Sequence, residues 1–221
     1  MGARMRVGSG ATRSLGLGNP PVPGCTVSER LHHVEGLSVT LFSLAGHTDI
    51  SAETYAFHKV LVVCWGRMEA YAADGRSWPC AEGDAFLMPP GVPVGVRTAD
   101  GCVYTEITLE GSTTMHELLR AGEAIRLADL LPYQDGKVVN MDLAHNERMK
   151  LALMSFSSGT GLDEHATPGE ALVFALDGEG VIGYEGEEHV VRAGENFKFD
   201  KGGRHFVRAD KPFKMALLLT F

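Results

Sequence analysis

The sequence predicts an all-β protein built from two similar halves that are joined by a short helical connector. Three observations support this fold class: an internal repeat, a series of short apolar segments separated by glycine turns, and one segment with helical start and stop signals. Proteins made of many short strands are typically sandwiches or barrels. We therefore expect each half to form its own sheet structure around its own core.

The repeat relates residues 26–66 to residues 138–178 without a gap, at an offset of 112. The matched identities include Leu31 with Leu143, His33 with His145, Glu35 with Glu147, Leu41 with Leu153, Ser43 with Ser155, and Gly66 with Gly178. Further along, Gly83 and Gly91 fall on Gly194 and Gly202 at an offset of 111. Apolar positions and turn glycines that stay in step are the signature of a duplicated structural unit.

Composition limits the classes of function. The 221 residues carry a formal net charge of −8, with 44% hydrophobic and 22% charged residues, which is typical of a soluble globular protein. A nucleic-acid partner is not expected, because phosphate binding needs clustered Lys and Arg. A membrane partner is not expected either, since no apolar run approaches the roughly 18 residues of a spanning helix.

The first 24 residues differ from the rest of the chain. They contain Arg4, Arg6 and Arg13, no acidic residue, and many Gly, Pro and Ser. No continuous apolar run follows the arginines, so a secretory signal fits poorly. We expect residues 1–24 to form a flexible leader.

The cysteine pattern predicts neither a zinc ribbon nor a disulfide framework. The four cysteines all lie in the first half and form no C-x-x-C pair; they are Cys25, Cys64, Cys80 and Cys102. Zinc-ribbon spacing is therefore absent. Without an export signal, reduced thiols in a cytoplasmic protein are favoured over disulfides, with a Cys80–Cys102 bond as the alternative.

The strand predictions follow the same order in both halves. Segments 37–44 and 149–156 are rich in apolar β-formers, and segments 59–66 and 171–178 each close on a glycine. A hairpin follows in each half, with turns expected at Asp74-Gly75 within 67–88 and at Glu185-Gly186 within 180–200.

The segment 112–132 carries the helical signals. Thr114 stands three residues before Glu117, which is the capping-box spacing, and Pro132 ends the segment. Because this segment lies between the repeats, we expect it to be the connector. The expected domains are then residues 25–111 and residues 133–221.

Two motifs in the second half resemble those of the cupin family, which read G-x5-H-x-H-x3,4-E-x6-G and G-x5-P-x-G-x2-H-x3-N. Gly194, Gly202 and His205 match the second motif, with Asp200 at the proline position and Ala209 at that of the final Asn. In the first half the matching residues are Gly83, Pro89 and Gly91, but Val94 stands where the histidine belongs. The resemblance covers nearly all of both repeats.

The resemblance implies two tandem antiparallel jelly-roll barrels, with a family site for one divalent transition metal at the barrel mouth. Imidazole and carboxylate ligands suit Zn, Fe, Mn, Ni or Cu, and three protein ligands leave positions open for water or substrate. Alternate residues of a strand point to the same face, so H-x-H delivers two ligands to one place. The family's exposed sheets also suggest a homodimer.

The first motif of the second half admits two alignments. One places His165, Thr167 and Ala171 at the histidine, histidine and carboxylate positions, which leaves only His165 and His205 as ligands. The other places Asp163 first, His165 second and Glu170 as the carboxylate after a four-residue gap, with Glu170 turned inward by a bulge near Pro168-Gly169. A shift of one residue reverses the face that a side chain takes. The candidate metal site is accordingly His165, Glu170 and His205, in the C-terminal barrel only.

The first half has replaced every expected ligand. Glu53, Tyr55, Lys59 and Val94 stand at the four ligand positions. A protonated lysine and a valine cannot ligate a metal, so we expect the N-terminal barrel to be degenerate and metal-free.

Two classes of function remain open at this point. The first is a metal-dependent enzyme acting on a small polar substrate, for which the resemblance implies a dioxygenase, isomerase, epimerase or decarboxylase. The second is a non-catalytic module that binds or senses a small molecule, since barrels of this size can enclose one. A histidine at a barrel mouth also has a purely structural alternative, namely a hydrogen bond to a neighbour. The fold does not decide among these readings.

Overall fold

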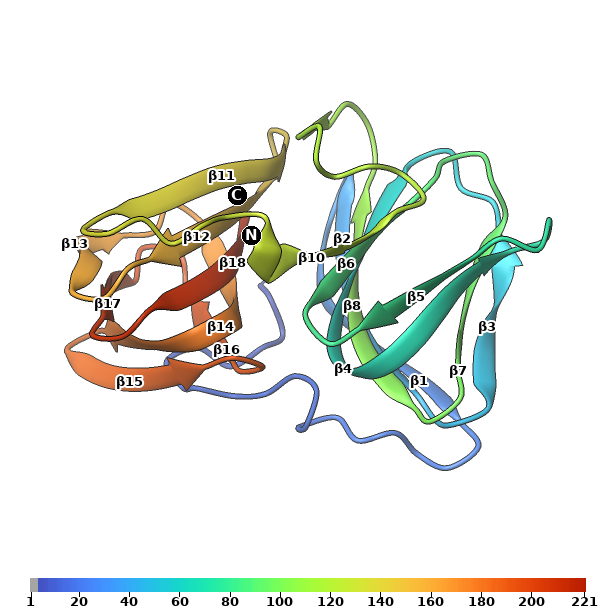
Figure 1. The fold of residues 1–221 in the computed structure, drawn as a ribbon, viewed down its shortest axis with the longest axis horizontal. Helices are drawn as coiled ribbons and strands as arrows, with labels where there is room; N and C mark the ends of the chain where they lie inside the picture. Colours follow the sequence, from blue (N-terminus) through green and yellow to red (C-terminus); the bar gives the residue numbers. More distant parts are fainter. Residues whose placement is uncertain (1–3) are drawn as a thin grey trace. The chain divides into compact units, whose positions relative to one another are not determined.

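The computed structural model describes residues 4–221, which separate into two compact units. The N-terminal barrel comprises residues 4–6, Leu15–Thr113 and Glu117–Arg126; the C-terminal barrel comprises Val7–Ser14, Thr114–His116 and Leu127–Phe221. Each unit consists of antiparallel strands (Figure 1). The all-β prediction is confirmed, whereas the domain boundaries at residues 25–111 and 133–221 remain predictions from the sequence.

The N-terminal barrel has a main sheet in the order β1-β2-β8-β4-β6-β10, while β3, β5 and β7 join through β4. Its strands are β1 (Thr26–Val34), β2 (Leu37–Leu44), β3 (Thr48–Glu53), β4 (His58–Ala72), β5 (Ser77–Ala81), β6 (Asp84–Met88), β7 (Val94–Thr98), β8 (Cys102–Leu109) and β10 (Ala124–Arg126). The long strand β4 pairs with β6 and β8 in its first half and with β5 and β7 in its second. It therefore carries the chain from one wall of the barrel to the other.

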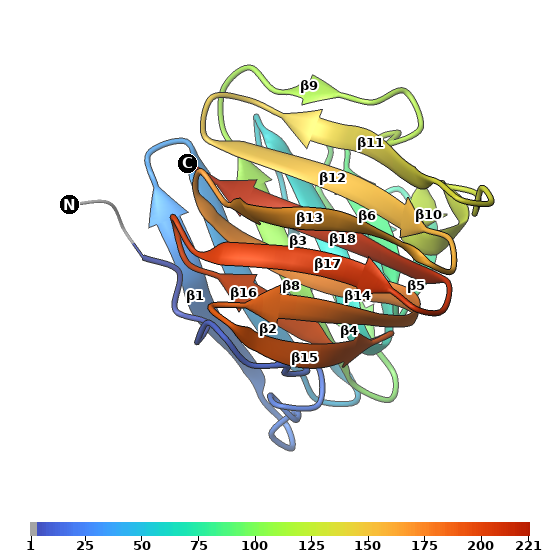
Figure 2. The same ribbon diagram turned by 90° about the vertical axis from the view of Figure 1, so that its left-hand side faces the viewer.

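The C-terminal barrel repeats this plan, with the order β13-β17-β14-β18-β12-β11-β9 and with β15 and β16 paired to β14 (Figure 2). Its strands are β9 (Thr114–Met115), β11 (Val138–His145), β12 (Met149–Phe156), β13 (Thr160–Ala166), β14 (Glu170–Tyr184), β15 (Glu187–Arg192), β16 (Asn196–Phe199), β17 (Arg204–Ala209) and β18 (Phe213–Thr220). The strand β14 corresponds to β4 and likewise passes from one wall to the other.

The repeated glycines Gly66 and Gly178 lie where these two long strands change walls. Both have positive φ, 76° and 71°, a conformation that favours glycine. A Cβ on Gly178 would lie 1.9 Å from the carbonyl oxygen of Pro212, and one on Gly66 would lie 2.4 Å from that of Gly101. The repeat keeps a glycine here because the neighbouring backbone leaves no room for a side chain.

Each barrel is filled by side chains from the inner faces of its strands. In the C-terminal barrel the buried cluster is Phe156, Ala171, Val173, Ala175, Ile182, Val191, Phe197, Phe199, Val207, Ala209, Phe213 and Met215. In the N-terminal barrel a cluster that includes Leu61, Phe86 and Tyr104 does the same. Full burial of a Leu or Phe side chain contributes about 1.5–3 kcal/mol, so these clusters supply the main stabilisation of each barrel.

The helical connector predicted for residues 112–132 is wrong. Thr114–Met115 forms β9 and pairs with β11, Ala124–Arg126 forms β10 and pairs with β6, and Leu127–Asp129 forms a single 3₁₀ turn. Gly122 between the two strands has a φ of 77°, which a helix does not accommodate. The strands β11 and β6 provide backbone partners for β9 and β10, and such tertiary pairing overrides weak helix propensity.

The segment expected to be a flexible leader is held to the barrels from residue 5 onward. Met5 and Leu15 are buried, and the Arg6 N–H donates to the carbonyl of Leu31. Arg13 forms an antiparallel bridge with Asn196 at the edge of β16. Composition alone did not reveal these contacts, because they depend on tertiary partners; the sheet edge that Arg13 meets lies 183 residues away in the chain.

Within residues 4–221, the structure contains no helix long and apolar enough to cross a membrane.

Candidate functional site

His165 and His205 lie opposite each other on neighbouring strands of the C-terminal barrel. The register of β13 against β17 pairs their Cα atoms directly, after an irregularity between Leu162 and His165. The centroids of the two imidazole rings are 4.3 Å apart. His205 is buried and His165 is exposed, so the pair runs from the barrel interior to its surface.

His205 belongs to the inner face of the barrel. It alternates along β17 with Val207 and Ala209, which are both members of the core cluster. Its ring stacks on that of Phe199, with centroids 4.0 Å apart and an angle of 26° between the planes. Phe199 therefore fixes the imidazole from one side, and His165 approaches it from another.

Backbone carbonyls define the tautomer of both histidines. His165 Nδ1 lies 2.8 Å from the carbonyl oxygen of Asp163, and His205 Nδ1 lies 3.2 Å from that of Gly203. A carbonyl oxygen can only accept, so each Nδ1 carries the hydrogen. In the neutral rings each Nε2 is then an acceptor, and the site offers two of them.

Burial lowers the pKa of His205, and the neighbouring His165 lowers it further, against an opposing contribution from the Gly203 carbonyl. The neutral ring is thus favoured in the folded protein, because an imidazolium loses hydration in the barrel interior. This keeps the Nε2 acceptor of His205 available at neutral pH.

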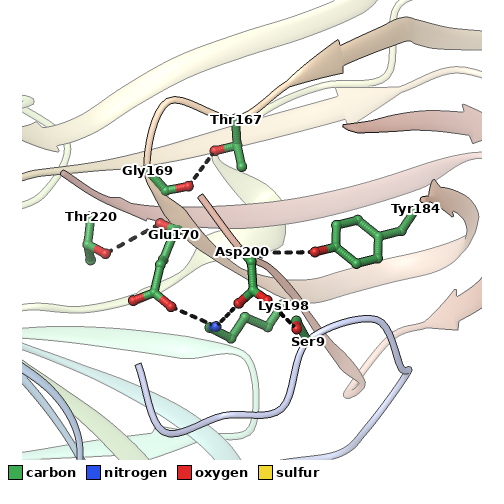
Figure 3. Close-up of polar contacts among 8 residues, drawn as sticks. All are labelled: Ser9, Thr167, Gly169, Glu170, Tyr184, Lys198, Asp200 and Thr220. Carbon is green, nitrogen blue, oxygen red and sulfur yellow. Dashed lines mark hydrogen bonds and ion pairs between the residues drawn. The ribbon is translucent and has the colours of Figure 1, made fainter. Parts of the chain in front are cut away.

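Glu170, the third predicted ligand, does not join the two histidines. Its carboxylate lies 2.7 Å from Nζ of Lys198, whose ammonium also lies 2.6 Å from Asp200 (Figure 3). Asp200 in turn accepts a hydrogen bond of 2.7 Å from the Ser9 hydroxyl. Lys198 has a side-chain exposure of 1%, so Glu170 serves a buried ion pair.

The register of β14 explains where Glu170 points. The pairing of β14 with β18 is regular from Glu170 to Ala175, without the bulge that would turn Glu170 inward. Ala171 belongs to the inner core cluster, so its neighbour Glu170 takes the opposite face. Lys198 likewise stands between the inner-facing Phe197 and Phe199, which places the ion pair outside the barrel interior.

The remaining motif positions do not complete a metal site. Ala171 occupies the inner-face position of the carboxylate, and the Thr167 hydroxyl donates to the carbonyl of Gly169. Within residues 4–221, no three or more His, Cys, Asp or Glu side chains are grouped closely enough to hold a metal ion. Two imidazoles without a carboxylate do not fit the three-ligand set that the family motif implies.

The corresponding position of the N-terminal barrel is charged. Lys59 is the repeat counterpart of Ala171, and its Nζ lies 2.9 Å from Oε1 of Glu106. Tyr55 lies beside it, while Val94 belongs to the apolar core. Sequence reasoning missed Glu106 because it lies in no motif; its only sequence signal is an acidic residue within the otherwise uncharged strand 102–109.

The grooves described on the surface are lined by residues other than the histidine pair and the Lys59–Glu106 pair. One of about 330 Å³ is lined by Thr160, Glu164, Phe206, Arg208 and their neighbours, and contains neither histidine. Another of about 760 Å³ lies on the N-terminal barrel beside Arg67 and Arg97. Neither groove therefore contains the imidazoles or the ion pair that lie on the inner faces of the barrels.

Family models match most of the chain. A model described as a cupin domain matches residues 152–221, and one described as an AraC-like ligand binding domain matches residues 49–156. No curated protein matches the chain.

Solved structures of similar fold include a Cupin 2 conserved barrel domain protein from Leptotrichia buccalis. It is 26% identical, with a TM-score of 0.87 over 99% of this chain and 100% of the other. The protein Ylba from E. coli is 15% identical, with a TM-score of 0.60 over 99% and 94% of the two chains. A variant of Bacillus subtilis oxalate decarboxylase is 13% identical, with a TM-score of 0.53 over 98% and 78%. The last two likenesses show the fold alone.

Proposed function

This chain belongs to the cupin superfamily, and we propose that its C-terminal barrel binds a small polar molecule that donates hydrogen bonds to His165 and His205. The family models include one for ligand-binding domains, which supports small-molecule binding in general. The site in the C-terminal barrel is our own assignment.

The pairing of the two rings is the observation that carries the proposal. Both Nδ1 atoms are engaged by backbone carbonyls, so the two Nε2 atoms present acceptors and no donor. A ligand that complements them has N–H or O–H groups, as amides, nitrogen heterocycles and alcohols do. The apolar rings of Phe199 and Tyr184 line the same interior, which suits a ligand with a compact apolar body.

The charge pattern argues for binding through neutral hydrogen bonds. Glu170, the residue that one alignment of the motif puts at the carboxylate position, is committed to Lys198 on the opposite face. Turning Glu170 inward would break one of the two carboxylate contacts of the buried Lys198, which costs free energy, so Glu170 is not readily recruited. The histidine pair therefore acts without a carboxylate from this strand.

Binding can be tested with a panel of small amides, nitrogen heterocycles and alcohols, followed by thermal shift and isothermal titration. His165→Phe and His205→Phe keep an aromatic ring but remove the acceptors, so we expect affinity to fall by about 3–10-fold for each lost neutral hydrogen bond. His145→Phe, an exposed histidine on β11, is the matched control and should bind as the wild type does.

Two results would overturn the proposal. One is binding that is equally strong in wild type, His165→Phe and His205→Phe. The other is a near-stoichiometric divalent metal, found by elemental analysis of untagged protein, that His205→Phe loses and His145→Phe keeps. That second result would establish a metal centre at the histidine pair in place of a hydrogen-bonding site.

A further inference from the structure

One wall of the N-terminal barrel is built from β3, β7, β4 and β5, which pair in that order (Figure 1). Along β4, Met68 and Ala70 belong to the inner core cluster. Side chains alternate between the two faces of a strand, so Arg67, Glu69 and Tyr71 take the outer face. All three line the groove of about 760 Å³ on this barrel. That volume is within the range of sites that hold a small molecule, so the outer face of this wall is a candidate binding site.

Four side chains of the groove satisfy one another. Arg97 donates to Glu69 over 2.6 Å, and the Tyr71 hydroxyl donates to Asp49 over 3.2 Å. The Arg97 guanidinium lies 5.0 Å from the centroid of the Tyr71 ring, which is a cation–π distance. The two hydrogen-bonded pairs are thereby joined into one network, and they leave other residues of the groove to meet a ligand.

Three titratable side chains of the groove stand outside this network: His47, Arg67 and Asp100. All three residues are exposed. Among residues 4–221, the structure gives none of these side chains a hydrogen bond or an ion pair. Water solvates them in the absence of a ligand, and a ligand with complementary groups can replace that water.

The buried Thr98 connects the backbone segments that carry these three residues. Its hydroxyl donates to the Arg67 carbonyl over 2.7 Å and accepts from the Gly101 N–H over 3.0 Å. Its carbonyl accepts from the His47 N–H over 2.9 Å. Asp100 lies in the short segment between Thr98 and Gly101. The three segments are therefore fixed to one residue, and such preorganisation lowers the cost of binding.

His47 has a backbone conformation for which the other repeat uses glycine. The φ of His47 is 61°, and that of Gly159, its counterpart at the offset of 112, is 78°. A residue with a Cβ loses about 1–2 kcal/mol in this region. Residues held in such conformations concentrate at functional sites, where the side chain is needed. The first barrel tolerates the strain and places an imidazole in the groove.

The charges of the groove narrow the class of ligand. Three carboxylates, those of Asp49, Glu69 and Asp100, stand against the guanidinium groups of Arg67 and Arg97. This excess of negative charge disfavours a ligand that is only anionic, and a ligand that is only cationic leaves Arg67 without a partner. A ligand that carries both charges complements the groove.

We propose that this groove binds a small zwitterion, with its carboxylate on Arg67 and His47 and its ammonium on Asp100. A guanidinium binds a carboxylate through two parallel N–H donors, and an aspartate accepts from an ammonium. Free amino acids and short peptides share this chemistry. The site lies on the outer face of the N-terminal barrel, so it is independent of the histidine pair in the other barrel.

The probes are alanine, trialanine, and trialanine blocked by acetylation of its amine or by amidation of its carboxylate. Binding to the full chain is measured by isothermal titration. We expect alanine or trialanine to bind, and the tighter of the two identifies the source of the zwitterion. Each block should weaken the binding of trialanine by about 3–10-fold, because it removes one charged hydrogen bond in a partly exposed place.

Two variants assign the ends of the ligand. Arg67→Gln should abolish the difference between trialanine and its amide while keeping the difference between trialanine and its acetylated form. Asp100→Asn should do the reverse. A misfolded protein would not lose one preference and keep the other. Arg30→Gln, which changes an exposed arginine on β1 outside the groove, is the matched control and should bind as the wild type does.

His47→Gly tests the strained residue. Glycine accommodates the positive φ without strain, so we expect the melting temperature to be no lower than that of wild type while binding weakens.

Any of three outcomes would overturn the proposal. The first is that neither alanine nor trialanine binds. The second is that the blocked peptides bind as tightly as the free one. The third is that Arg67→Gln, Asp100→Asn or His47→Gly binds every probe as the wild type does.

Discussion

The two barrels share one plan but differ at the same inner position. The C-terminal barrel has Ala171 there, with His205 on a neighbouring strand; the N-terminal barrel has Lys59 there, and Val94 in place of the histidine. One barrel therefore pairs the rings of the buried His205 and the exposed His165, and the other has an ion pair with hydroxyl neighbours. A duplicated scaffold can diverge in ligand chemistry while its glycines and core positions stay fixed, because those positions serve the barrel and not the ligand.

The largest expected effect comes from the mostly buried ion pair of the N-terminal barrel, Lys59 with Glu106. Lys59→Ala should lower the free energy of unfolding of the N-terminal barrel by about 3–4 kcal/mol, because it leaves Glu106 with an uncompensated charge in a mostly buried place. Lys59→Met/Glu106→Leu, which replaces the whole pair by apolar side chains of similar volume, should recover most of that loss. Urea denaturation of both variants measures the difference. A loss no greater than that of Lys150→Met, which removes an exposed lysine paired with Asp142, would contradict it.

The second prediction concerns a variant that adds a third metal ligand to the histidine pair of the C-terminal barrel. Ala171→Glu places a carboxylate on the inner face that already carries His205, as the family motif does, at a cost from added volume in the core. We expect zinc affinity to rise on the order of 100-fold over wild type, because a third protein ligand joins two imidazoles. Zinc titration checks this. Combining it with His205→Phe should remove the gain, and a gain that persists would place the metal elsewhere.

The third prediction concerns the long strands β4 and β14, each of which passes from one wall of its barrel to the other. Gly178→Ala should destabilise the protein by about 2–3 kcal/mol, since it adds a backbone clash with Pro212 to the strain of a positive φ. Gly186→Ala is the matched control, because its φ of 89° carries the same kind of strain while no atom lies within 4 Å. It should cost about 1–2 kcal/mol. Equal losses measured by thermal denaturation would show that the close approach contributes nothing.

The smallest expected effect is the pH dependence of the histidine site. The pKa of His205 is lowered in the folded protein, so the unfolded chain binds the proton more readily. Stability from this group is complete above the unfolded pKa of about 6.5 and declines as the pH falls below it. Denaturation midpoints recorded from about pH 8 to pH 5 should fall more steeply for wild type than for His205→Phe. Parallel curves would contradict the assignment.

Much of the fold could be predicted from local signals. Gly66 and Gly178, at an offset of 112, indicated a duplicated all-β unit, and in the structure both mark the same change of wall. The connector could not be predicted, because Thr114 and Glu117 carry helical signals while the pairing of β9 and β10 depends on distant sheet edges. Local propensity is a weak guide wherever a tertiary partner is available.

The candidate site, like the fold, could be predicted from the sequence only in part. Motif spacing selected His165 and His205, and strand register brings them together. It also selected Glu170 as a ligand in one of two alignments, but the regular pairing of β14 turns that side chain to the opposite face. The choice depended on a bulge of a single residue, which spacing alone does not reveal.

By itself, the sequence determined the repeat, the strand-rich class and which residues stand at the motif's ligand positions in each half. These follow from composition, periodicity and motif spacing, which are local properties of the chain. The tertiary structure decided the partners: Lys198 for Glu170, Glu106 for Lys59 and Phe199 for His205. The physical reason is that partnership depends on which face of a strand a residue takes and which strand lies beside it, and both are settled only when the sheet closes.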